Sequence, residues 1–463
     1  MPVHRRHTDE THAAAMLSQA ALASLQLTLG APAPRSRMPE TPIAADVAAA
    51  VIRDELSLDG NARLNLATFV TTSMEPQADE LIALCLDKNM IDKDEYPQTA
   101  ELERRCVSML ADLWNAPGDD GIGCSTTGSS EACMLGALAL KRRWQHRRRA
   151  VGRPADQPNL VLGINAQVCW EKFCNYFEVE PRLVPMAGER FHLGVPEAIA
   201  RCDENTIGVV GILGSTFDGS YEPVADLAAA LDDLQARTGL DVPIHVDGAS
   251  GAMVAPFIDP ELIWDFRLPR VASINTSGHK YGRVYPGVGW IVWRAEDGLP
   301  DDLVLRVNYL GGEMPTFALN FSRPGAHVVA QYYEFLRLGR DGYRAVQRAC
   351  RDAATSIARQ VAGLGPFRLI TDGSELPVFA FTTTEDVAAF DVYDVSRRLR
   401  ERGWLVPAYP FPREREDLHV LRVVVRTGNI DLLQLLVDDL ARLLPELERQ
   451  PGPLAGPTRS FHH

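Results

Sequence analysis

The chain has 463 residues, with 47 basic and 61 acidic side chains, and therefore a formal net charge of −14 at pH 7. Hydrophobic residues make up 46% and charged residues 23% of the chain, which is typical of a soluble globular protein with a large core. The acidic balance argues against nucleic-acid binding, and no apolar run is long enough to form a membrane-spanning helix.

Eight cysteines are scattered along the chain without a Cys-x-x-Cys pair, and Cys169 and Cys174 are the closest two. This spacing predicts neither a zinc site nor a disulfide framework, and it is typical of a reducing compartment. We therefore expect a cytoplasmic protein with no bound metal.

The N-terminal residues differ in composition from the rest of the chain. A basic stub at His4–His7 precedes an Ala- and Leu-rich stretch, Ala13–Leu29, which is expected to form a helix. The proline-rich stretch Gly30–Pro42 is expected to be a linker. We interpret residues 1–63 as an N-terminal arm or an oligomer contact, because acidic residues near its start disfavour a transit peptide.

The next part of the chain alternates short apolar runs with helical stretches. Small polar residues follow each apolar run, as they follow strands that are buried on both faces of a parallel sheet. The pattern predicts a large, doubly wound α/β domain over residues 64–350, with its ligand site beyond the strand ends. The apolar runs lie at residues 159–163, 207–213, 242–246, 271–274 and 287–293.

A smaller α/β pattern closes the chain. Helical periodicity extends over Val328–Leu338 and Gly342–Leu364, and two apolar runs then alternate with two helical stretches. We interpret residues 351–463 as a small C-terminal domain. The apolar runs and helical stretches lie at residues 376–381, 392–402, 420–425 and 432–447.

The segment Ser273–Lys280 closes an apolar run and ends in Ser-Gly-His-Lys. A lysine at a strand end among small residues is expected to be partly desolvated, which lowers the pKa of its amine. A neutral amine can form a Schiff base, although a lysine in a solvated loop would give the same motif.

Two further segments end or begin at the same edge of the predicted sheet. Asp247 follows an apolar run, where it could face a planar ligand or cap the next helix. Thr126–Glu131 precedes the helical stretch Ala132–Trp144, and hydroxyls with free N–H groups at a helix start make a phosphate cradle, although a plain N-cap would look similar. Together with Lys280, these segments are what pyridoxal phosphate (PLP) needs: a phosphate anchor, an amine for its aldehyde, and a carboxylate for its pyridine nitrogen.

Longer motifs make the chain similar to the glutamate decarboxylases of bacteria and plants. The resemblance extends from about Val51 to the C-terminus, and it implies the fold-type I architecture of PLP enzymes. That architecture has a large domain with a mostly parallel seven-stranded sheet, a small C-terminal α/β domain and an N-terminal arm. The motifs are Asp59–Arg63, Asn65–Phe69, Asn89–Pro97, Gly128–Met134, Asp203–Val209, Trp264–Arg270, Ser277–Lys280 and Asn320–Pro324.

The resemblance implies how the cofactor is bound. Lys280 would form the Schiff base, and Asp247 would pair with the pyridine nitrogen. Gln167 and Ala249 would lie on the two faces of the ring, and Thr216 would lie near the phenolic oxygen. The phosphate would be held by Ser129, Ser130, Ser277 and His279, with Ser322 reaching in from a second subunit.

The resemblance also implies how the substrate is bound. Thr68, the backbone N–H of Phe69, and Asp92 from the neighbouring subunit would contact the distal carboxylate. Arg426 would bind the α-carboxylate, and Tyr309, on a Gly-rich loop, would help to protonate the substrate carbanion. The catalytic residues would be Lys280, Asp247, His279 and Tyr309.

Some features concern regulation or differ from the family. The final Ser-Phe-His-His resembles a family motif in which His463 would close the active site at neutral pH. The tail after Leu447 lacks a calmodulin-binding helix, so we predict no calmodulin control. The basic stretch Lys141–Arg149 is interpreted as the solvent-facing end of a helix rather than a nucleic-acid site. Gly248 stands where the family usually has alanine, which should loosen the strand end.

We therefore predict a cytoplasmic, PLP-dependent enzyme that converts L-glutamate to 4-aminobutyrate (GABA) and CO2 and consumes one proton. Because Ser322 and Asp92 would serve the neighbouring site, we expect at least a homodimer, and the family is also compatible with a homohexamer. No nucleic-acid or membrane partner is expected.

Three alternatives remain at this point. A PLP-dependent decarboxylase or carbon–carbon lyase for another amino-group substrate would keep the same anchoring residues. A non-catalytic scaffold with this fold would be expected to lose Lys280 or Asp247, and the chain retains both. A nucleotide-binding α/β protein ranks last, because the chain lacks the glycine-rich phosphate motifs of that class.

Overall fold

The computed structural model describes residues 36–118, 120–308, 314–450 and 452. The chain divides into a first unit that ends at Ala62 and a second that begins at Arg63. The first unit holds the helix α2 (Ala45–Leu56), in which no residue is buried. The predicted helix at 13–29 lies outside the described residues, and the described end of the predicted linker, residues 36–42, contains neither helix nor strand.

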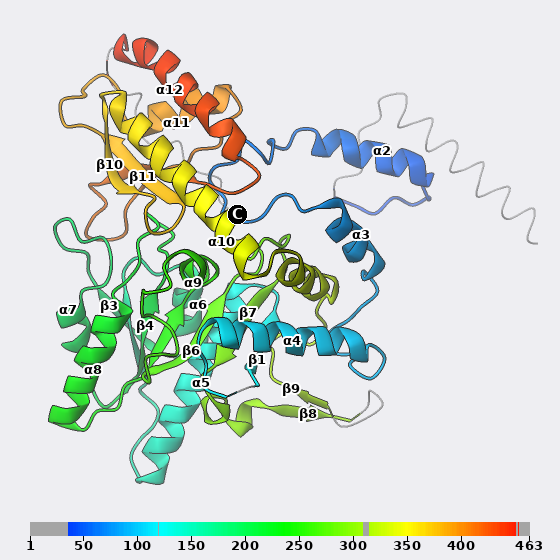
Figure 1. The fold of residues 1–463 in the computed structure, drawn as a ribbon, viewed down its shortest axis with the longest axis vertical. Helices are drawn as coiled ribbons and strands as arrows, with labels where there is room; N and C mark the ends of the chain where they lie inside the picture. Colours follow the sequence, from blue (N-terminus) through cyan, green and yellow to red (C-terminus); the bar gives the residue numbers. More distant parts are fainter. Residues whose placement is uncertain (1–35, 119, 309–313, 451, 453–463) are drawn as a thin grey trace, which may run out of the picture. The chain divides into compact units, whose positions relative to one another are not determined.

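A seven-stranded sheet forms the centre of the second unit (Figure 1), in the order β1-β7-β6-β5-β4-β2-β3. The strands from β6 to β3 pair in parallel, whereas β7 runs antiparallel to both of its neighbours. The mostly parallel seven-stranded sheet that the family resemblance implied is therefore confirmed. Its strands are β1 (Ile122–Thr126), β2 (Asn159–Gly163), β3 (Glu180–Val184), β4 (Thr206–Ile212), β5 (Ile244–Asp247), β6 (Val271–Thr276) and β7 (Gly289–Trp293).

The strands that were located from apolar runs are β2, β4, β5, β6 and β7, and their observed bounds differ from the predicted ones by no more than a few residues. The two strands that were not located, β1 and β3, form the edges of the sheet. Each is exposed or half-buried over part of its length, and β1 has a glycine while β3 has a glutamate and a proline. Edge strands need not be apolar on both faces, so they do not appear as continuous apolar runs.

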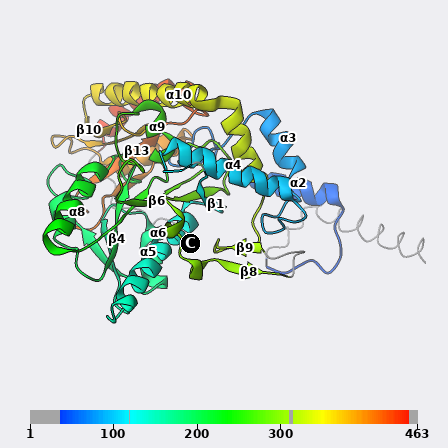
Figure 2. The same cartoon turned by 60° about the horizontal axis from the view of Figure 1, so that its bottom comes forward.

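Helices cover both faces of this sheet (Figures 1 and 2). Leu160 and Leu162 of β2 join a core cluster with Trp170 and other residues of α5 and α6, whereas Val161 joins the opposite cluster with residues such as Leu231 of α8. This alternation is expected because successive strand side chains point to opposite faces. The helices are α3 (Pro76–Leu84), α4 (Pro97–Leu113), α5 (Ser129–Ala150), α6 (Val168–Tyr176), α7 (Val195–Ile199), α8 (Val224–Thr238) and α9 (Ala255–Ile258), with short 3-10 turns at Gly251–Met253, Glu296–Gly298 and Asp301–Leu303.

A long helical element, α10 (Ala326–Gly363), packs against α3, α4 and α9 and continues to the C-terminal part of the chain. Its backbone leaves helical geometry at Gly339, where φ is 56° and ψ is −172°. The break agrees with the prediction of two consecutive helices that meet near this residue. Glycine adopts a positive φ without the steric cost of a Cβ, so it permits the change of direction.

The C-terminal residues form a four-stranded antiparallel sheet in the order β10-β11-β13-β12. The predicted α/β pattern is confirmed here, whereas β10 and β12 were not predicted. The elements are β10 (Phe367–Asp372), β11 (Val378–Thr383), α11 (Val392–Glu401), β12 (Ala408–Pro410), β13 (His419–Val424), the 3-10 turn Ile430–Leu432 and α12 (Leu433–Glu448). The domain boundaries at residues 63/64 and 350/351 stay a prediction, and the second falls within α10.

A short antiparallel ribbon of β8 (Leu305–Val307) and β9 (Met314–Thr316) precedes α10. Among the described residues, no helix combines the length and the hydropathy that crossing a bilayer requires. The basic stretch Lys141–Arg149 lies at the end of α5 as predicted, and Arg147 forms an ion pair with Asp241.

The fold aligns the strand ends that carry the candidate site. β4, β5 and β6 are parallel neighbours that end at Ile212, Asp247 and Thr276, so the residues after them meet at one edge of the sheet. β1 has the same direction as β6, because both are antiparallel to β7, and the start of α5 therefore lies at this edge as well. The position of the site beyond the strand ends is the one expected for doubly wound sheets.

At this edge of the sheet, neighbouring atoms leave no room for a side chain at Gly248. A Cβ added at Gly248 would lie 2.4 Å from the Cβ of Ala252 and 3.0 Å from the backbone oxygen of Asn275. Gly248→Ala should therefore overpack the strand end and lower the free energy of unfolding by about 1–3 kcal/mol. The double variant Gly248→Ala/Ala252→Gly should recover most of that loss, as measured by chemical denaturation. Equal stability of Gly248→Ala and the unchanged chain, or no recovery in the double variant, would contradict this packing account.

Candidate active site

A cavity of roughly 400 Å³ opens at the edge where β4, β5 and β6 end. Its walls also include the start of α5, the residues before α6 and the preceding segment at Phe69. The structure brings together at this cavity ten of the residues that the sequence singled out. These are Phe69, Ser129, Ser130, Gln167, Thr216, Asp247, Ala249, Ser277, His279 and Lys280.

Hydroxyl groups and a helix start form one end of the cavity. α5 begins at Ser129, whose Oγ lies 2.7 Å from the hydroxyl of Ser277, and the first N–H groups of a helix have no intrahelical acceptor. Glu131 fixes the preceding turn by accepting hydrogen bonds from the N–H of Thr127 at 2.8 Å and from its hydroxyl at 3.0 Å. Donors of this kind at a helix N-terminus suit an anion.

His279 borders the same end of the cavity. Burial, followed by the positive charge of Lys280 and the neighbouring His327, lowers the pKa of His279 to about 4. The Gly287 N–H donates to Nδ1 at 3.4 Å, so the proton of the neutral ring lies on Nε2. His279 is therefore a neutral hydrogen-bond donor at physiological pH.

Lys280 lies in the turn that follows β6. Burial is the main cause of its lowered pKa, and the negative charge of Asp247 partly opposes that effect. Its Nζ donates to the hydroxyl of Ser250 at 3.3 Å and lies 5.3 Å from the centre of the Phe69 ring. A lysine in this setting has more of the neutral, nucleophilic amine than an exposed one.

Asp247 ends β5 at the opposite end of the cavity. Its Oδ2 accepts a hydrogen bond from the indole N–H of Trp170 at 2.8 Å. Its Oδ1 accepts from the Ala249 N–H at 3.1 Å and from the Nδ2 of Asn275 at 3.2 Å. Donors on three sides hold the carboxylate in one orientation and stabilise its negative charge.

Two buried residues that sequence reasoning missed connect the ends of the cavity. The Nδ2 of Asn275 donates both to Asp247 and, at 3.2 Å, to the Oγ of Ser129. His245 holds this amide through a 2.8 Å contact between its Nε2 and the Oδ1 of Asn275, while its Nδ1 lies 2.7 Å from the hydroxyl of Ser273. Burial lowers the pKa of His245, so its ring is neutral. The sequence did contain a signal for these two residues, because His245 is a polar residue inside a run that was predicted to be a buried strand and Asn275 directly follows another such run.

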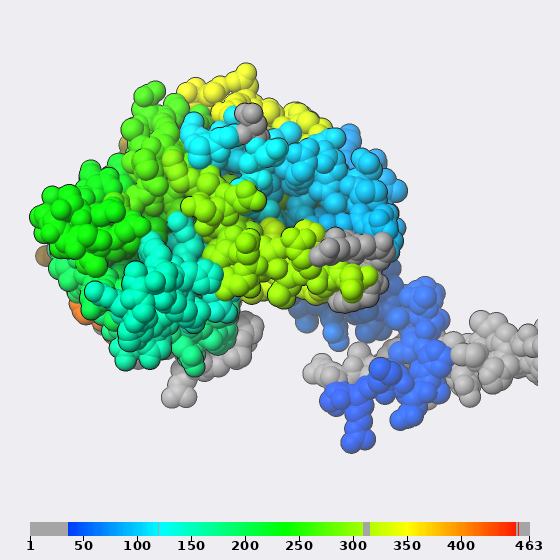
Figure 3. Space-filling view, turned by 90° about the horizontal axis from the view of Figure 1, so that it is seen from below, coloured from blue at the N-terminus to red at the C-terminus, as the bar shows by residue number. Residues whose placement is uncertain are grey.

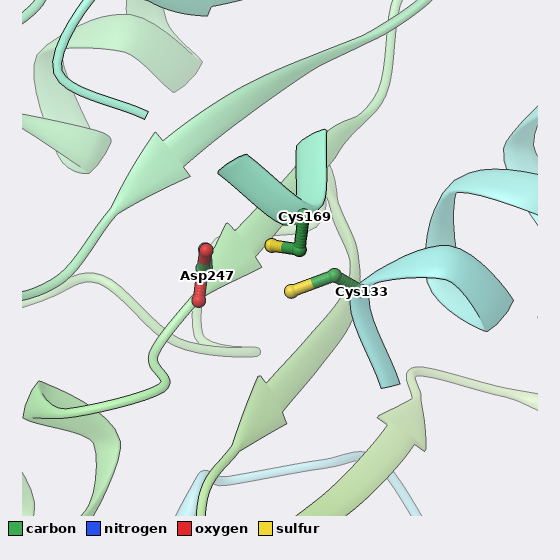
Figure 4. A group of neighbouring side chains, drawn as sticks. All are labelled: Cys133, Cys169 and Asp247. Carbon is green, nitrogen blue, oxygen red and sulfur yellow. The ribbon is translucent and has the colours of Figure 1, made fainter. Parts of the chain in front are cut away.

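Two thiols lie beside Asp247 (Figure 4). Cys133 belongs to α5 and Cys169 to α6, and both line the cavity. Both thiols are buried. Gln167 caps α6, because its side-chain oxygen accepts the N–H of Cys169 at 2.7 Å.

Arg426 holds the segment that carries Thr68 and Phe69. Its Nη1 donates to the Val70 carbonyl at 2.7 Å, and its Nη2 donates to the Asn65 carbonyl at 2.7 Å. The Nε of Arg426 is buried and has no hydrogen-bond partner among the described residues. Thr68 and Arg426 do not belong to the lining of the cavity itself.

Arg422 of β13 is a second arginine at the site, and sequence reasoning missed it. Its side chain is buried and donates to the backbone oxygens of Thr216 and Ala67, the latter at 2.6 Å. Its guanidinium carbon lies 4.8 Å from the centre of the Phe69 ring. Within the described part of the chain it forms no ion pair, so its positive charge adds to that of Lys280. An arginine inside an otherwise apolar strand was the signal for it.

The residues expected to serve a neighbouring subunit, Asp92 and Ser322, lie outside the lining of the cavity. They belong to two segments that pair with each other. Asn89 donates to the hydroxyl of Ser322 at 3.3 Å, and the Met90 N–H donates to the carbonyl of Arg323 at 2.9 Å. Figure 3 shows the cyan surface of the segment with α4 beside the yellow-green surface of the segment with β8 and β9.

Two predicted residues, Tyr309 and His463, lie outside the described residues. The loop that carries Tyr309 is bounded by the described strands β8 and β9.

A family model described as the pyridoxal-dependent decarboxylase conserved domain matches residues 39–384, so the chain belongs to the pyridoxal-dependent decarboxylases. The chain is 53% identical over 422 residues to the glutamate decarboxylase of Aliivibrio fischeri, a match that covers 90% of this chain and 91% of that relative. It is 49% identical over 426 residues to glutamate decarboxylase 5 of Arabidopsis thaliana, covering 91% and 86%.

A solved structure, the glutamate decarboxylase of Lactobacillus brevis, matches with a TM-score of 0.88 and 46% identity, covering 90% of this chain and 96% of that chain. Within the pyridoxal-dependent decarboxylases, the chain therefore belongs to the glutamate decarboxylase family. The fold-type I architecture that the sequence predicted is confirmed.

The family implies PLP as the cofactor, and the cavity fits it. Hydroxyls and a helix start suit the phosphate, Lys280 lines the same cavity, and the Asp247 carboxylate can accept a hydrogen bond from a protonated ring nitrogen. A Cβ at Gly128 would lie 3.1 Å from the Cε1 of His279, so glycine allows the turn before α5 to approach the imidazole. The cavity volume is within the range of small-molecule sites.

The lowered pKa of His279 has a consequence for stability in the cofactor-free chain. The ordinary pKa of histidine is 6.5, and that of His279 in the folded chain is about 4. Between these two pH values His279 therefore binds a proton in the unfolded chain but not in the folded chain. Stability is therefore lost as pH falls through this window, by up to about 3 kcal/mol from this residue. His279→Gln should lose correspondingly less stability between these pH values in chemical denaturation.

Above pH about 7 the pH dependence of stability of the two proteins should coincide, because His279 is then neutral in both states. An acid-side slope that is the same in His279→Gln and in the unchanged chain would contradict the assignment.

Proposed function

We propose that the chain catalyses the α-decarboxylation of L-glutamate to 4-aminobutyrate and CO2, with the consumption of one proton. The observation that carries this proposal is that a candidate phosphate cradle, Lys280 and Asp247 line one cavity. Arg426 holds the segment that contributes Phe69 to the same cavity. Membership of the glutamate decarboxylase family supports the substrate.

Bound PLP supplies a ring system that accepts the electron pair left on the substrate when CO2 departs. In our assignment, Lys280 provides the amine that anchors the cofactor, and Asp247 accepts the hydrogen bond of the pyridine nitrogen. Gln167 and Ala249 would lie against the two faces of the ring, and Thr216 would lie near its phenolic oxygen. The phosphate would be bound by Ser129, Ser130, Ser277 and His279, with Ser322 from a neighbouring subunit.

Arg426 has the donors to orient the substrate's α-carboxylate. Decarboxylation is fastest when the bond to the departing carboxylate stands perpendicular to the cofactor ring, and a guanidinium fixes that geometry because it is planar. The hydrogen bonds that Arg426 donates to the backbone oxygens of Asn65 and Val70 keep its guanidinium in place.

The distal carboxylate of glutamate requires hydrogen-bond donors in the site. A substrate with a shorter side chain would not reach these donors, and one with an apolar side chain would not bond to them. We assign Thr68 and the N–H of Phe69 to this carboxylate, together with Asp92 of a neighbouring subunit. Two carboxylates that share a site retain one proton between them, so binding should favour acidic pH. The positive charge of Arg422 behind Phe69 further favours an anionic substrate.

Tyr309 is assigned to proton delivery and His463 to closure of the site at neutral pH. Both assignments rest on the sequence motif alone. The pairing of the Asp92 and Ser322 segments supports the proposal that one neighbouring subunit contributes both. We therefore propose a homodimer or a larger homo-oligomer, such as a hexamer, in the cytoplasm.

A second candidate is a PLP-dependent decarboxylase or carbon–carbon lyase that acts on another amino-group substrate. The residues that anchor the cofactor would serve either reaction. Only the residues around the substrate distinguish the two, and Thr68, Phe69 and Asp92, which we assign to a distal carboxylate, favour a dicarboxylic amino acid.

The substrate assignment is tested by CO2 release at about pH 4.5 and about pH 7.5 from L-glutamate, L-aspartate and an aromatic amino acid. Release should occur from glutamate, be stronger at the acidic pH, and be abolished in Lys280→Ala. Retention of PLP without release from glutamate would contradict the substrate assignment but not the fold.

A second test concerns Arg426. Arg426→Lys keeps the positive charge but loses the planar guanidinium, so kcat/KM for glutamate should fall by about 100-fold or more. The absorbance of bound PLP should be unchanged, which would show that the cavity is intact. An unchanged kcat/KM would contradict the role in orienting the α-carboxylate.

A further inference from the structure

The lining of the cavity contains a group of three potential metal ligands, of which the proposed reaction uses only Asp247. The thiols of Cys133 and Cys169 and a carboxylate oxygen of Asp247 all lie within 4.8 Å of one another. The exposed fractions of the three residues are 0%, 4% and 5%. Figure 4 shows the thiols of Cys133 in α5 and Cys169 in α6 side by side, both pointing toward the Asp247 carboxylate at the end of β5.

We propose that Cys133, Cys169 and Asp247 bind a thiophilic divalent cation, Zn²⁺ or Cd²⁺, in the cofactor-free chain. We further propose that this cation and PLP exclude each other, because both need the carboxylate of Asp247. The exclusion rests on the assignment of Asp247 to the pyridine nitrogen, whereas the binding of the cation does not.

The ligand set has the chemistry of such a site. Two sulfur ligands and one oxygen ligand select a soft or borderline cation over Mg²⁺ or Ca²⁺. Ligands about 2.0–2.3 Å from a tetrahedral zinc ion lie about 3.3–3.8 Å apart, so the group needs to contract by about 1 Å. Water in the cavity can supply the fourth ligand, because all three residues line the cavity.

The charges around the site also balance. Cys133 and Cys169 are free cysteines that are not paired in a disulfide, so each can bind the cation as a thiolate after it loses its proton. Binding breaks two S–H bonds, forms two bonds from sulfur to the cation, and releases two protons to the buffer. Two thiolates and the Asp247 carboxylate carry one negative charge more than the divalent cation neutralises, and the basic side chains of Lys280 and Arg422 nearby offset this excess.

The hydrogen bonds of Asp247 fix the orientation of its carboxylate and still leave its oxygens able to bind a cation. Trp170, Ala249 and Asn275 fix the carboxylate, and each carboxylate oxygen can accept more than one partner. Outer hydrogen bonds of this kind orient a metal ligand and raise cation affinity. A disulfide between the two thiols is a different outcome, because it would require an oxidant and an approach of the sulfurs to about 2.05 Å.

Titration of the full-length, cofactor-free chain with Cd²⁺ tests the binding, because Cd²⁺ bound to thiolates has a charge-transfer absorption in the ultraviolet. One Cd²⁺ per chain should bind with this absorption. Cys133→Ser and Cys169→Ser should each lower the intensity by about half and weaken binding by roughly ten-fold or more. Cys174→Ser is the matched control, since Cys174 is also buried on α6 but lies outside this group, and it should bind like the unchanged chain.

The absence of a saturable thiolate absorption, or equal binding by Cys133→Ser and the unchanged chain, would overturn the site. Circular dichroism of each variant shows that a loss of binding is not a loss of fold.

Reconstitution with PLP tests the exclusion. Cd²⁺ should slow the return of the PLP absorbance in the unchanged chain and in Cys174→Ser but not in Cys133→Ser, and a chelator should restore it. Recovery of PLP at an unchanged rate in the presence of bound Cd²⁺ would overturn the exclusion. Because Cd²⁺ binding is read without substrate, a failure of the glutamate assignment would leave this result unaffected.

Discussion

The site depends on one buried carboxylate that must be satisfied from several sides at once. A carboxylate taken out of water costs several kcal/mol unless donors surround it. Three residues provide those donors: Trp170 in α6, Ala249 in the turn that follows β5, and Asn275 in β6. The Asp247 carboxylate is therefore satisfied only in a chain whose sheet order brings these three elements together, and the role that we propose for it depends on that order.

The amide of Asn275 makes the two ends of the cavity interdependent. It contacts Asp247 at one end and Ser129 at the other, and the neutral ring of His245 fixes its orientation. One side chain therefore links the position of Ser129 to that of the carboxylate. Arg422 and Arg426 tie the segment around Phe69 to the small sheet, so the position of this segment depends on residues distant in the sequence.

Much of this arrangement could be predicted from the sequence, and the rest has identifiable physical reasons. Strands buried on both faces appear as apolar runs, whereas the edge strands β1 and β3 do not. Motif residues such as Lys280 could be recognised because they follow such runs. His245, Asn275 and Arg422 could not be assigned, because the role of a polar residue in a buried strand depends on which strand lies beside it. Likewise, the crowding of Gly248 by its neighbour depends on a turn geometry that the sequence pattern does not specify.

The most direct test of this account is the protonation state of the ring nitrogen in the holoenzyme. The ¹⁵N chemical shift of ¹⁵N-labelled PLP bound to the full chain reports it without reference to activity. We expect a protonated nitrogen from about pH 5 to about pH 8 in the unchanged protein and in Asp247→Glu, and loss of this proton in Asp247→Asn. A nitrogen that is unprotonated at neutral pH in the unchanged protein, or equally protonated in Asp247→Asn, would contradict the central role of the Asp247 carboxylate.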